Sequence, residues 1–217
     1  MAEKKASAWL PSRDTMSGVS YDSPGYLLTS LRDAFLARLR ERIDVEECAD
    51  FRNWSLESGS VPEAPDADAF IWFGEIGRDY RREYNLGLLK ALSKKTEVIN
   101  SPPGYETAMD KYLTNTFLAE NGLPVPPFAL ITPENAEGFR GWGGPLLLKP
   151  RLGSYGIGII RLERASDAVN VVDYCPGVHY AEKLIPNDPA EWIGVNIIGG
   201  EHAYSYRKGP ESFHDGW

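Results

Sequence analysis

The most informative stretch of this sequence is an apolar run that ends in a lysine and leads into a glycine-rich segment. The run is Leu146–Lys149, and the segment Gly153–Gly158 reads Gly-Ser-Tyr-Gly-Ile-Gly before a second apolar run begins. Glycine lets backbone N–H groups approach an anion closely, and a row of such donors forms a nest that binds phosphate. Lys149 would add a positive charge at the base of the loop. The pattern predicts either two strands joined by a phosphate-binding flap or a β-hairpin whose glycines serve only its turn.

Other phosphate-binding motifs do not fit this segment. A P-loop needs Gly-Lys-Ser/Thr at the start of a helix, and a dinucleotide fold needs Gly-x-Gly-x-x-Gly between a strand and a helix. Protein kinases place a glycine-rich flap between two strands, but the sequence contains neither His-Arg-Asp nor Asp-Phe-Gly. If the loop covers a nucleotide, the protein therefore belongs to none of these three classes.

Short apolar runs and helical periods predict a small parallel α/β domain in residues 1–100. Strands are expected at Ala6–Leu10, Ala69–Phe73 and Thr96–Asn100, and Ile43–Cys48 alternates weakly between apolar and polar residues. One helix would start at Ser23 and Pro24 and bury a face made of Leu28, Leu31, Phe35 and Leu39. A second would bury Tyr80, Tyr84, Leu88 and Leu92. Strands that alternate with helices favour a parallel sheet with helices packed on it.

Residues 101–217 predict a second, α+β domain with a largely antiparallel sheet. Asn100–Gly104 should break regular structure and mark the boundary. A helix that carries Met109, Leu113 and Phe117 on one face should end at Gly122. The strands expected after it are Phe128–Ile131, Leu146–Lys149, Gly158–Leu162, Val178–Ile185, Ile193–Ile198 and Ala203–Tyr206.

Composition narrows the class of protein. The 217 residues are 42% hydrophobic and carry a formal net charge of −8, which argues against a dominant surface for nucleic acid or anionic membranes. The two cysteines, Cys48 and Cys175, predict neither a zinc site nor a disulfide framework, and the three histidines show no ligand spacing. No apolar run is long enough to span a bilayer, and the first residues do not resemble a signal peptide, so a soluble cytoplasmic protein is expected.

The sequence resembles the ATP-grasp superfamily, in particular the branch of the ribosomal-protein glutamate ligase and the lysine-biosynthesis carrier-protein ligases. The matches occur in the family's order and cover Val98 to Arg207. They are Val98–Pro102, Asp110-Lys111, Asn121–Pro126, and Leu148–Pro150 with Gly153–Gly158. Several ordered matches are far more specific than any one of them.

The resemblance implies a role for each matching position. Lys111 and Lys149 would contact the phosphates of ATP, and Arg207 would be catalytic by stabilising the transferred phosphoryl group or a substrate carboxylate. The loop that would close over the phosphates comprises Gly153, Ser154, Tyr155, Gly156 and Gly158. The hinge that would bind the adenine edge and the ribose comprises Glu182, Lys183, Leu184 and Ile185. Without the resemblance, Lys111 could be a solvated helix lysine and Glu182 an ordinary charge on an edge strand.

The sequence departs from the family in two places. Trp192-Ile193-Gly194 stands where relatives carry Asp-x-Arg, and Gly209–Trp217 does not match the family's metal carboxylates and asparagine. The metal ligands therefore stay unknown, with Glu211 and Asp215 as the acidic candidates. Arg13, Asp14 and Glu75 follow predicted strands of the first domain, and parallel sheets place sites at the carboxyl ends of their strands. These three are the candidates for substrate contacts.

The resemblance implies a ligase that uses ATP and Mg²⁺. The enzyme would phosphorylate a carboxylate, and an amine would attack the acyl phosphate to give an amide, ADP and phosphate. Its partners would be small-molecule or peptide substrates, with no nucleic acid and no membrane, and a homo-oligomer is compatible with the sequence. One alternative is a nucleotide-binding module without catalysis. The other is a small-molecule binding domain that takes no nucleotide.

Overall fold

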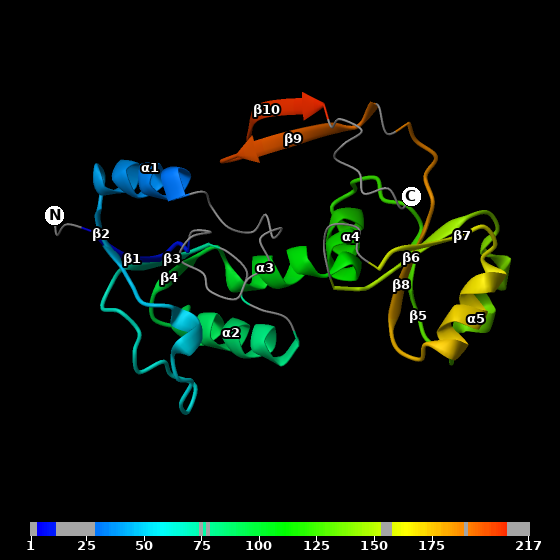
Figure 1. The fold of residues 1–217 in the computed structure, drawn as a ribbon, viewed down its shortest axis with the longest axis horizontal. Coiled ribbons are helices and arrows are strands. Elements are labelled where there is room, and N and C mark those ends of the chain that lie inside the picture. The colour runs from blue at the N-terminus through cyan, green and yellow to red at the C-terminus, as the bar shows by residue number, and fades with distance from the viewer. Residues whose placement is uncertain are drawn as a thin grey trace. The chain divides into compact units, whose positions relative to one another are not determined.

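The computed structural model describes residues 4–11, 29–73, 76, 79–152, 158–188 and 191–207. The chain forms two compact units, residues 1–106 and 107–217 (Figure 1). The sequence predicts a boundary after residue 100, whereas the two units divide after Glu106, within helix α3 (Pro102–Met109). In the described part of the chain, no helix is both long enough and apolar enough to cross a membrane.

The first unit is built on a four-stranded parallel sheet, as the sequence predicts. Its strands are β1 (Lys5–Trp9), β2 (Asp44–Glu47), β3 (Ala69–Trp72) and β4 (Glu97–Ile99), in the order β2-β1-β3-β4. Helix α1 (Thr29–Arg40) connects β1 to β2, and helix α2 (Asp79–Leu92) connects β3 to β4. A 3₁₀ turn, η2 (Phe51–Asn53), follows β2. The two helices cover opposite faces of the sheet (Figure 1).

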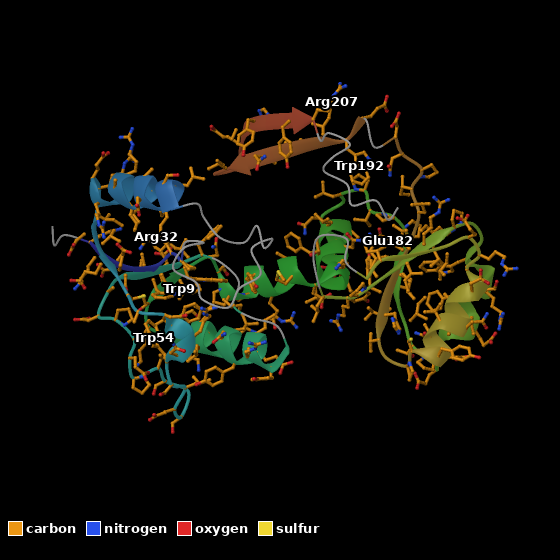
Figure 2. The ribbon with its side chains drawn as sticks, in the orientation of Figure 1. Trp9, Arg32, Trp54, Glu182, Trp192 and Arg207 are labelled. Carbon is orange, nitrogen blue, oxygen red and sulfur yellow. The ribbon has the colours of Figure 1, made fainter. Side chains whose placement is uncertain are left out.

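The strands alternate between two apolar cores, because successive side chains of a strand point to opposite faces. Ala6, Ala8 and Ile71 pack with Leu36 of α1. On the other face, the core between the sheet and α2 contains Trp9 and Trp54 (Figure 2) together with Phe51, Phe70, Trp72, Leu88, Leu89 and Leu92. A sheet buried on both faces is the usual arrangement for parallel strands.

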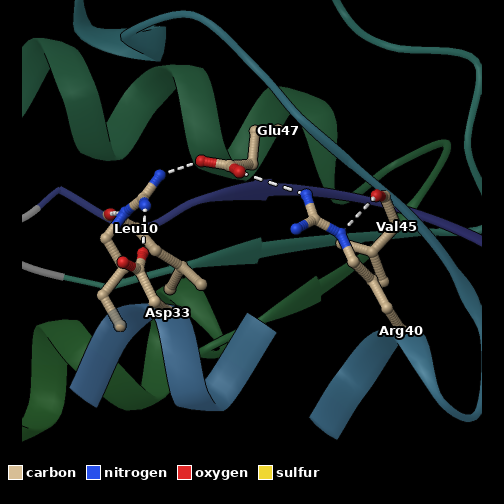
Figure 3. A network of polar contacts seen from close by, with 6 residues as sticks. Leu10, Asp33, Arg40, Val45 and Glu47 are labelled. Atoms are coloured by element: carbon tan, nitrogen blue, oxygen red, sulfur yellow. Dashed lines mark hydrogen bonds and ion pairs between the residues drawn. The ribbon is translucent and has the colours of Figure 1, made fainter. Parts of the chain in front are cut away.

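Helix α1 buries only part of the predicted face: Leu39 packs against the core, and Leu28 lies outside the described residues. Leu31 and Phe35 are 56% and 46% exposed, whereas Leu36 is 1% exposed. The face towards the sheet carries Arg32, Leu36 and Arg40, at the same helical spacing. Arg32 Nε donates to Leu10 O at 2.6 Å, and both arginines pair with Glu47 (Figure 3). Polar contacts with strand ends therefore set the rotation of α1. Similarly, Tyr80 of α2 was expected in the core and is 75% exposed.

The predicted break at Asn100–Gly104 is wrong in part, because α3 begins at Pro102. Proline is well accepted in the first turn of a helix, where its missing N–H is not needed. The helix expected through Met109 and Phe117 is divided at Asp110, whose carboxylate caps a new helix, α4 (Lys111–Glu120). Gly122 follows α4 with a φ of +73°, as expected for a glycine that ends a helix.

The second unit contains a four-stranded antiparallel sheet, which confirms the predicted α+β class. The strands are β5 (Phe128–Ile131), β6 (Leu146–Lys149), β7 (Ile160–Leu162) and β8 (His179–Lys183), in the order β5-β8-β6-β7. Helix α5 (Ser166–Tyr174) and a 3₁₀ segment, η3 (Ala136–Trp142), pack on this sheet. The sequence did not predict α5.

Strands β9 (Ile193–Ile198) and β10 (Glu201–Arg207) form a separate antiparallel hairpin. Gly199 and Gly200 have φ values of +61° and +83° at its turn, which is the geometry of a two-residue hairpin loop. Tyr206 covers Gly194, where a Cβ atom would lie 2.3 Å from the ring.

Candidate functional site

The centre of the candidate site is an ion pair between Lys149 and Glu182. Lys149 is the last residue of β6, and Glu182 lies on the adjacent strand β8. Lys149 Nζ pairs with Glu182 Oε1, and the two side chains are 16% and 15% exposed. Removal of either partner would leave the other as an unpaired charge with little access to water, which is strongly destabilising. The ends of two paired strands thus place a cation and an anion at the start of the glycine-rich loop.

A buried tyrosine orients the carboxylate of this pair. The Tyr180 hydroxyl donates to Glu182 Oε2 at 2.7 Å and accepts a hydrogen bond from Asn115 Nδ2 of α4. Burial raises the pKa of Tyr180 above its ordinary value, and the bond to Glu182 raises it further. The phenol therefore stays protonated and acts as a donor to the carboxylate. Both carboxylate oxygens are thus held, one by a cation and one by a hydroxyl.

Lys111 brings a second cation to the same place. Its Nζ donates to Pro150 O at 3.0 Å, directly after Lys149 in the chain. Burial lowers the pKa of Lys111, and the nearby charge of Lys149 lowers it further. Two ammonium groups beside the single carboxylate of Glu182 leave an excess of positive charge, which favours a bound anion.

Asp110 fastens the start of α4 to the first limb of the loop. This carboxylate, 5% exposed, accepts hydrogen bonds from the N–H groups of Tyr112 and Leu113 and pairs with Arg151 Nε at 2.6 Å. The Lys111 N–H also donates to Arg151 O at 3.1 Å, and an isolated bridge joins Asp110 to Leu152. Asp110 thereby fixes where Lys111 begins its helix.

The two ends of the loop approach each other at Pro150 and Gly158. Gly158 has a φ of +77°, and a Cβ atom there would lie 2.8 Å from Pro150 Cγ. Only glycine fits this position without a shift of its neighbour. The loop residues Gly153, Ser154, Tyr155 and Gly156 lie outside the described residues.

The predicted hinge, Glu182–Ile185, lies at the end of β8, and part of its backbone is hydrogen-bonded to other segments of the chain. The N–H groups of Lys183 and Leu184 donate to Pro127 O and Pro145 O at 2.9 and 3.1 Å. Ile185 is 54% exposed, and its carbonyl accepts a hydrogen bond from Asn187 Nδ2 at 2.9 Å. Asn187 in turn accepts from Trp192 Nε1 at 2.8 Å. These bonds order the chain that follows Glu182.

Of the remaining predicted residues, the structure describes only Arg207. Arg207 is the exposed last residue of β10, and no hydrogen bond or ion pair between described residues links it to Lys149 or Glu182 (Figure 2). The candidates Arg13, Asp14, Glu75, Glu211 and Asp215 lie outside the described part of the chain. Within the described ranges, no group of three or more His, Cys, Asp or Glu side chains could hold a metal ion.

Sequence reasoning missed Asn115 and Arg151, which complete the cluster. Asn115 reaches Tyr180 from a position 65 residues earlier in the chain, and nothing in its local sequence signals that contact. Arg151 directly follows the Lys-Pro pair and is held by Asp110.

Comparison with solved structures decides the fold. No known protein-family profile matches this sequence. The structure is similar to a RimK domain ATP-grasp protein from Sphaerobacter thermophilus, with a TM-score of 0.59 and 18% identity over 88% of this chain and 67% of that chain. The fold is that of ATP-grasp proteins.

Two further ATP-grasp structures agree. The D-cycloserine synthetase DcsG has a TM-score of 0.58 at 17% identity, with 95% of this chain and 69% of that chain covered. A D-alanine–D-alanine ligase from Bacillus anthracis, complexed with ATP, has a TM-score of 0.56 at 16% identity, with 94% and 63% covered. The present chain thus spans 63–69% of the length of these three proteins. Identities this low establish the ATP-grasp fold, so ligand and reaction are argued from the residues.

Proposed function

We propose that this chain carries the nucleotide-binding part of an ATP-dependent ligase that joins a carboxylate to an amine. The observation that carries the proposal is the cluster of Lys111, Lys149 and Glu182 beside the glycine-rich loop of an ATP-grasp fold. Two neighbouring lysines, Lys111 with its pKa lowered by burial and by the charge of Lys149, favour a polyanion. The partly buried carboxylate of Glu182 offers acceptors for hydroxyl or amino groups.

The described residues fit the parts of ATP. Lys111 and Lys149 would bind its phosphates, and Glu182, held by Tyr180, would accept hydrogen bonds from the ribose or the adenine edge through its remaining lone pairs. The contact of Gly158 with Pro150 keeps the limbs of the loop together. Gly153, Ser154, Tyr155 and Gly156 would form the cover of this flap. The hinge residues Lys183, Leu184 and Ile185 would line the adenine.

When bound, ATP supplies the phosphoryl group that turns the carboxylate into an acyl phosphate, which the amine attacks to give an amide, with ADP and phosphate released. The cations Lys111 and Lys149 would offset the negative charge that develops on the transferred group, and Arg207 is proposed to do the same. A closed flap would keep water from the acyl phosphate. We assign no ligand to Mg²⁺, which would accompany ATP.

The proposal extends to substrates and location. The carboxylate and amine would be amino acids, a peptide or a carrier protein, and the protein would work in the cytoplasm on neither nucleic acid nor membranes. The net charge of −8 supports the exclusion of nucleic acid.

Ligation is tested by phosphate release from ATP and Mg²⁺ in the presence of pairs of standard amino acids. We expect phosphate release that requires both a carboxylate and an amine and that is lost in Arg207→Gln. ADP binding without any release by any pair would reject ligation of amino acids and favour a nucleotide-binding module.

A further inference from the structure

The hairpin of β9 and β10 carries a row of exposed apolar side chains on β9 (Figure 1). Ile193, Val195 and Ile197 lie on one face, because side chains two residues apart in a strand point the same way, and they are 63%, 57% and 66% exposed. Among the described residues, neither strand of the hairpin pairs with a third. We propose that β9 pairs with β9 of a second copy of this chain, in a dimer whose two-fold axis passes through Val195.

The outer edge of β9 has backbone groups in the positions that such pairing needs. Ile198 and Glu201 flank the two-residue loop and pair with each other. Residues in these positions exchange two hydrogen bonds, and every second residue of the strand then faces the same partner. The N–H and C=O groups of Ile193, Val195 and Ile197 are therefore directed away from β10.

The two edges of the hairpin differ in charge and regularity. β9 contains no charged residue, whereas β10 begins at Glu201 and ends at Arg207. The register of β10 also shifts between His202 and Tyr204, as at a bulge. Charges and bulges on an edge strand discourage further pairing, and an uncharged apolar edge favours it. The exposed edge that invites a partner is therefore β9.

A pairing centred on Val195 matches two copies of β9 to each other. In an antiparallel pair around a two-fold axis, Val195 faces Val195 of the second copy, and Ile193 faces Ile197 of the second copy. The outward backbone groups of both copies then coincide, since these residues alternate along the strand. Their β-branched side chains meet on one face, and cross-strand pairs of this kind stabilise a sheet.

The same pattern explains why the partner is a second copy and why association ends at two. The combined sheet has the order β10-β9-β9-β10, so its outer edges are the charged strands. A symmetric interface uses the same patch on both copies and leaves none of it free. Each copy carries a net charge of −8, but no like charges meet in β9. Four strands with one apolar face are also more stable in water than an isolated hairpin.

The first test is sedimentation velocity of the whole chain without nucleotide, over a series of concentrations. We expect a monomer–dimer equilibrium with a Kd below ~100 μM and no larger species. A protein that stays monomeric at ~100 μM would overturn the proposal and leave β9 to a strand of another protein. Species that continue to grow beyond the dimer would overturn the closed two-fold pairing.

Val195→Lys should weaken the dimer at least about tenfold, because two ammonium groups would face each other across the axis. Tyr204→Lys is the matched control, since Tyr204 is 56% exposed, lies on β10 and introduces the same charge. It should dimerise like the wild type. Equal loss in both variants, or in neither, would overturn the assignment to β9.

A mixture of two variants tests the register and guards against misfolding. Val195→Lys and Val195→Glu should each be monomeric, and together they should form a mixed dimer, because residue 195 of one copy faces residue 195 of the other. Two monomeric variants that fail to combine would overturn the pairing centred on Val195.

Salt separates this interface from one made of ion pairs. Between ~0.1 M and ~1 M salt, the dimer should hold or strengthen, since screening reduces the repulsion between two acidic copies. A dimer that dissociates instead would identify Glu201 and Arg207 as the contacts and overturn the proposal. None of these measurements depends on the nucleotide site.

Discussion

Gly158 and Pro150 meet at the two ends of the glycine-rich loop, so closely that a Cβ atom on Gly158 would lie 2.8 Å from Pro150 Cγ. Gly158 also has a φ of +77°, which other L residues rarely adopt. The loop therefore begins and ends at nearly the same point, directly after Lys149. A flap over a nucleotide needs such a narrow base if its tip is to move while its ends stay fixed.

Gly158→Ala should destabilise the second unit by about 1–3 kcal/mol, since it adds both a strained φ and a clash. Urea denaturation measures the change. The matched control is Gly138→Ala, where a Cβ atom would meet nothing within 4 Å and φ is not positive. Similar losses in the two variants would contradict the close contact at Pro150.

Tyr180→Phe should cost about 1–3 kcal/mol, because Asn115 Nδ2 and Glu182 Oε2 each lose a partner out of water. It should also weaken ADP binding, since the carboxylate of Glu182 would no longer be oriented. Tyr174→Phe is the control, at a tyrosine that is 88% exposed. Calorimetric unfolding and ADP titration of both variants check the two effects. Unchanged ADP affinity in a folded Tyr180→Phe protein would show that Tyr180 serves stability alone.

Asp110→Ala should lower the free energy of unfolding by about 0.5–2 kcal/mol through loss of the helix cap, with a further loss from the pair with Arg151. Asp110→Asn keeps a capping oxygen and removes the charge, so the difference between the two variants separates cap from ion pair. Denaturation at neutral pH gives both values. Equal stability of Asp110→Ala and the wild type would contradict the cap.

ADP binding should weaken as the pH rises through the alkaline range below 10.5, the ordinary pKa of lysine. In the free protein, burial and Lys149 lower the pKa of Lys111, and a bound polyphosphate would raise it again. Between those two values, binding takes up a proton, so affinity falls with rising pH. Titration calorimetry at several pH values should show this slope in the wild type and a flatter one in Lys111→Met. Parallel slopes would remove Lys111 from the phosphate site.

The positions of several strands could be predicted from the local sequence. The strand that ends at Lys149 and the two strands on either side of Gly199-Gly200 could be predicted because their residue types directly limit the backbone. The buried face of α1 could not be predicted from the sequence alone. Its helical period is compatible with several faces, and contacts of Arg32 and Arg40 with strands distant in sequence select one.

The cluster was predicted only where a motif marks it. Lys111, Lys149 and Glu182 stand in recognisable positions, but the Tyr180–Asn115 link joins residues 65 positions apart. Helix α5 was missed because its short apolar pattern, Val169 and Val172, resembles the neighbouring strand runs.

The central claim is a nucleotide site at Lys149 and Glu182, and thermal unfolding with and without ADP and Mg²⁺ tests it most directly. A ligand at 100 times its Kd adds ~2.7 kcal/mol to the native state. The comparison variant is Lys149→Met with Glu182→Gln, which removes both charges and leaves neither unpaired, and Lys95→Ala is the control at an exposed lysine. We expect a clear rise of the unfolding temperature for the wild type and Lys95→Ala and none for the double variant. A well-folded wild type without a shift, or an equal shift in the double variant, would contradict it.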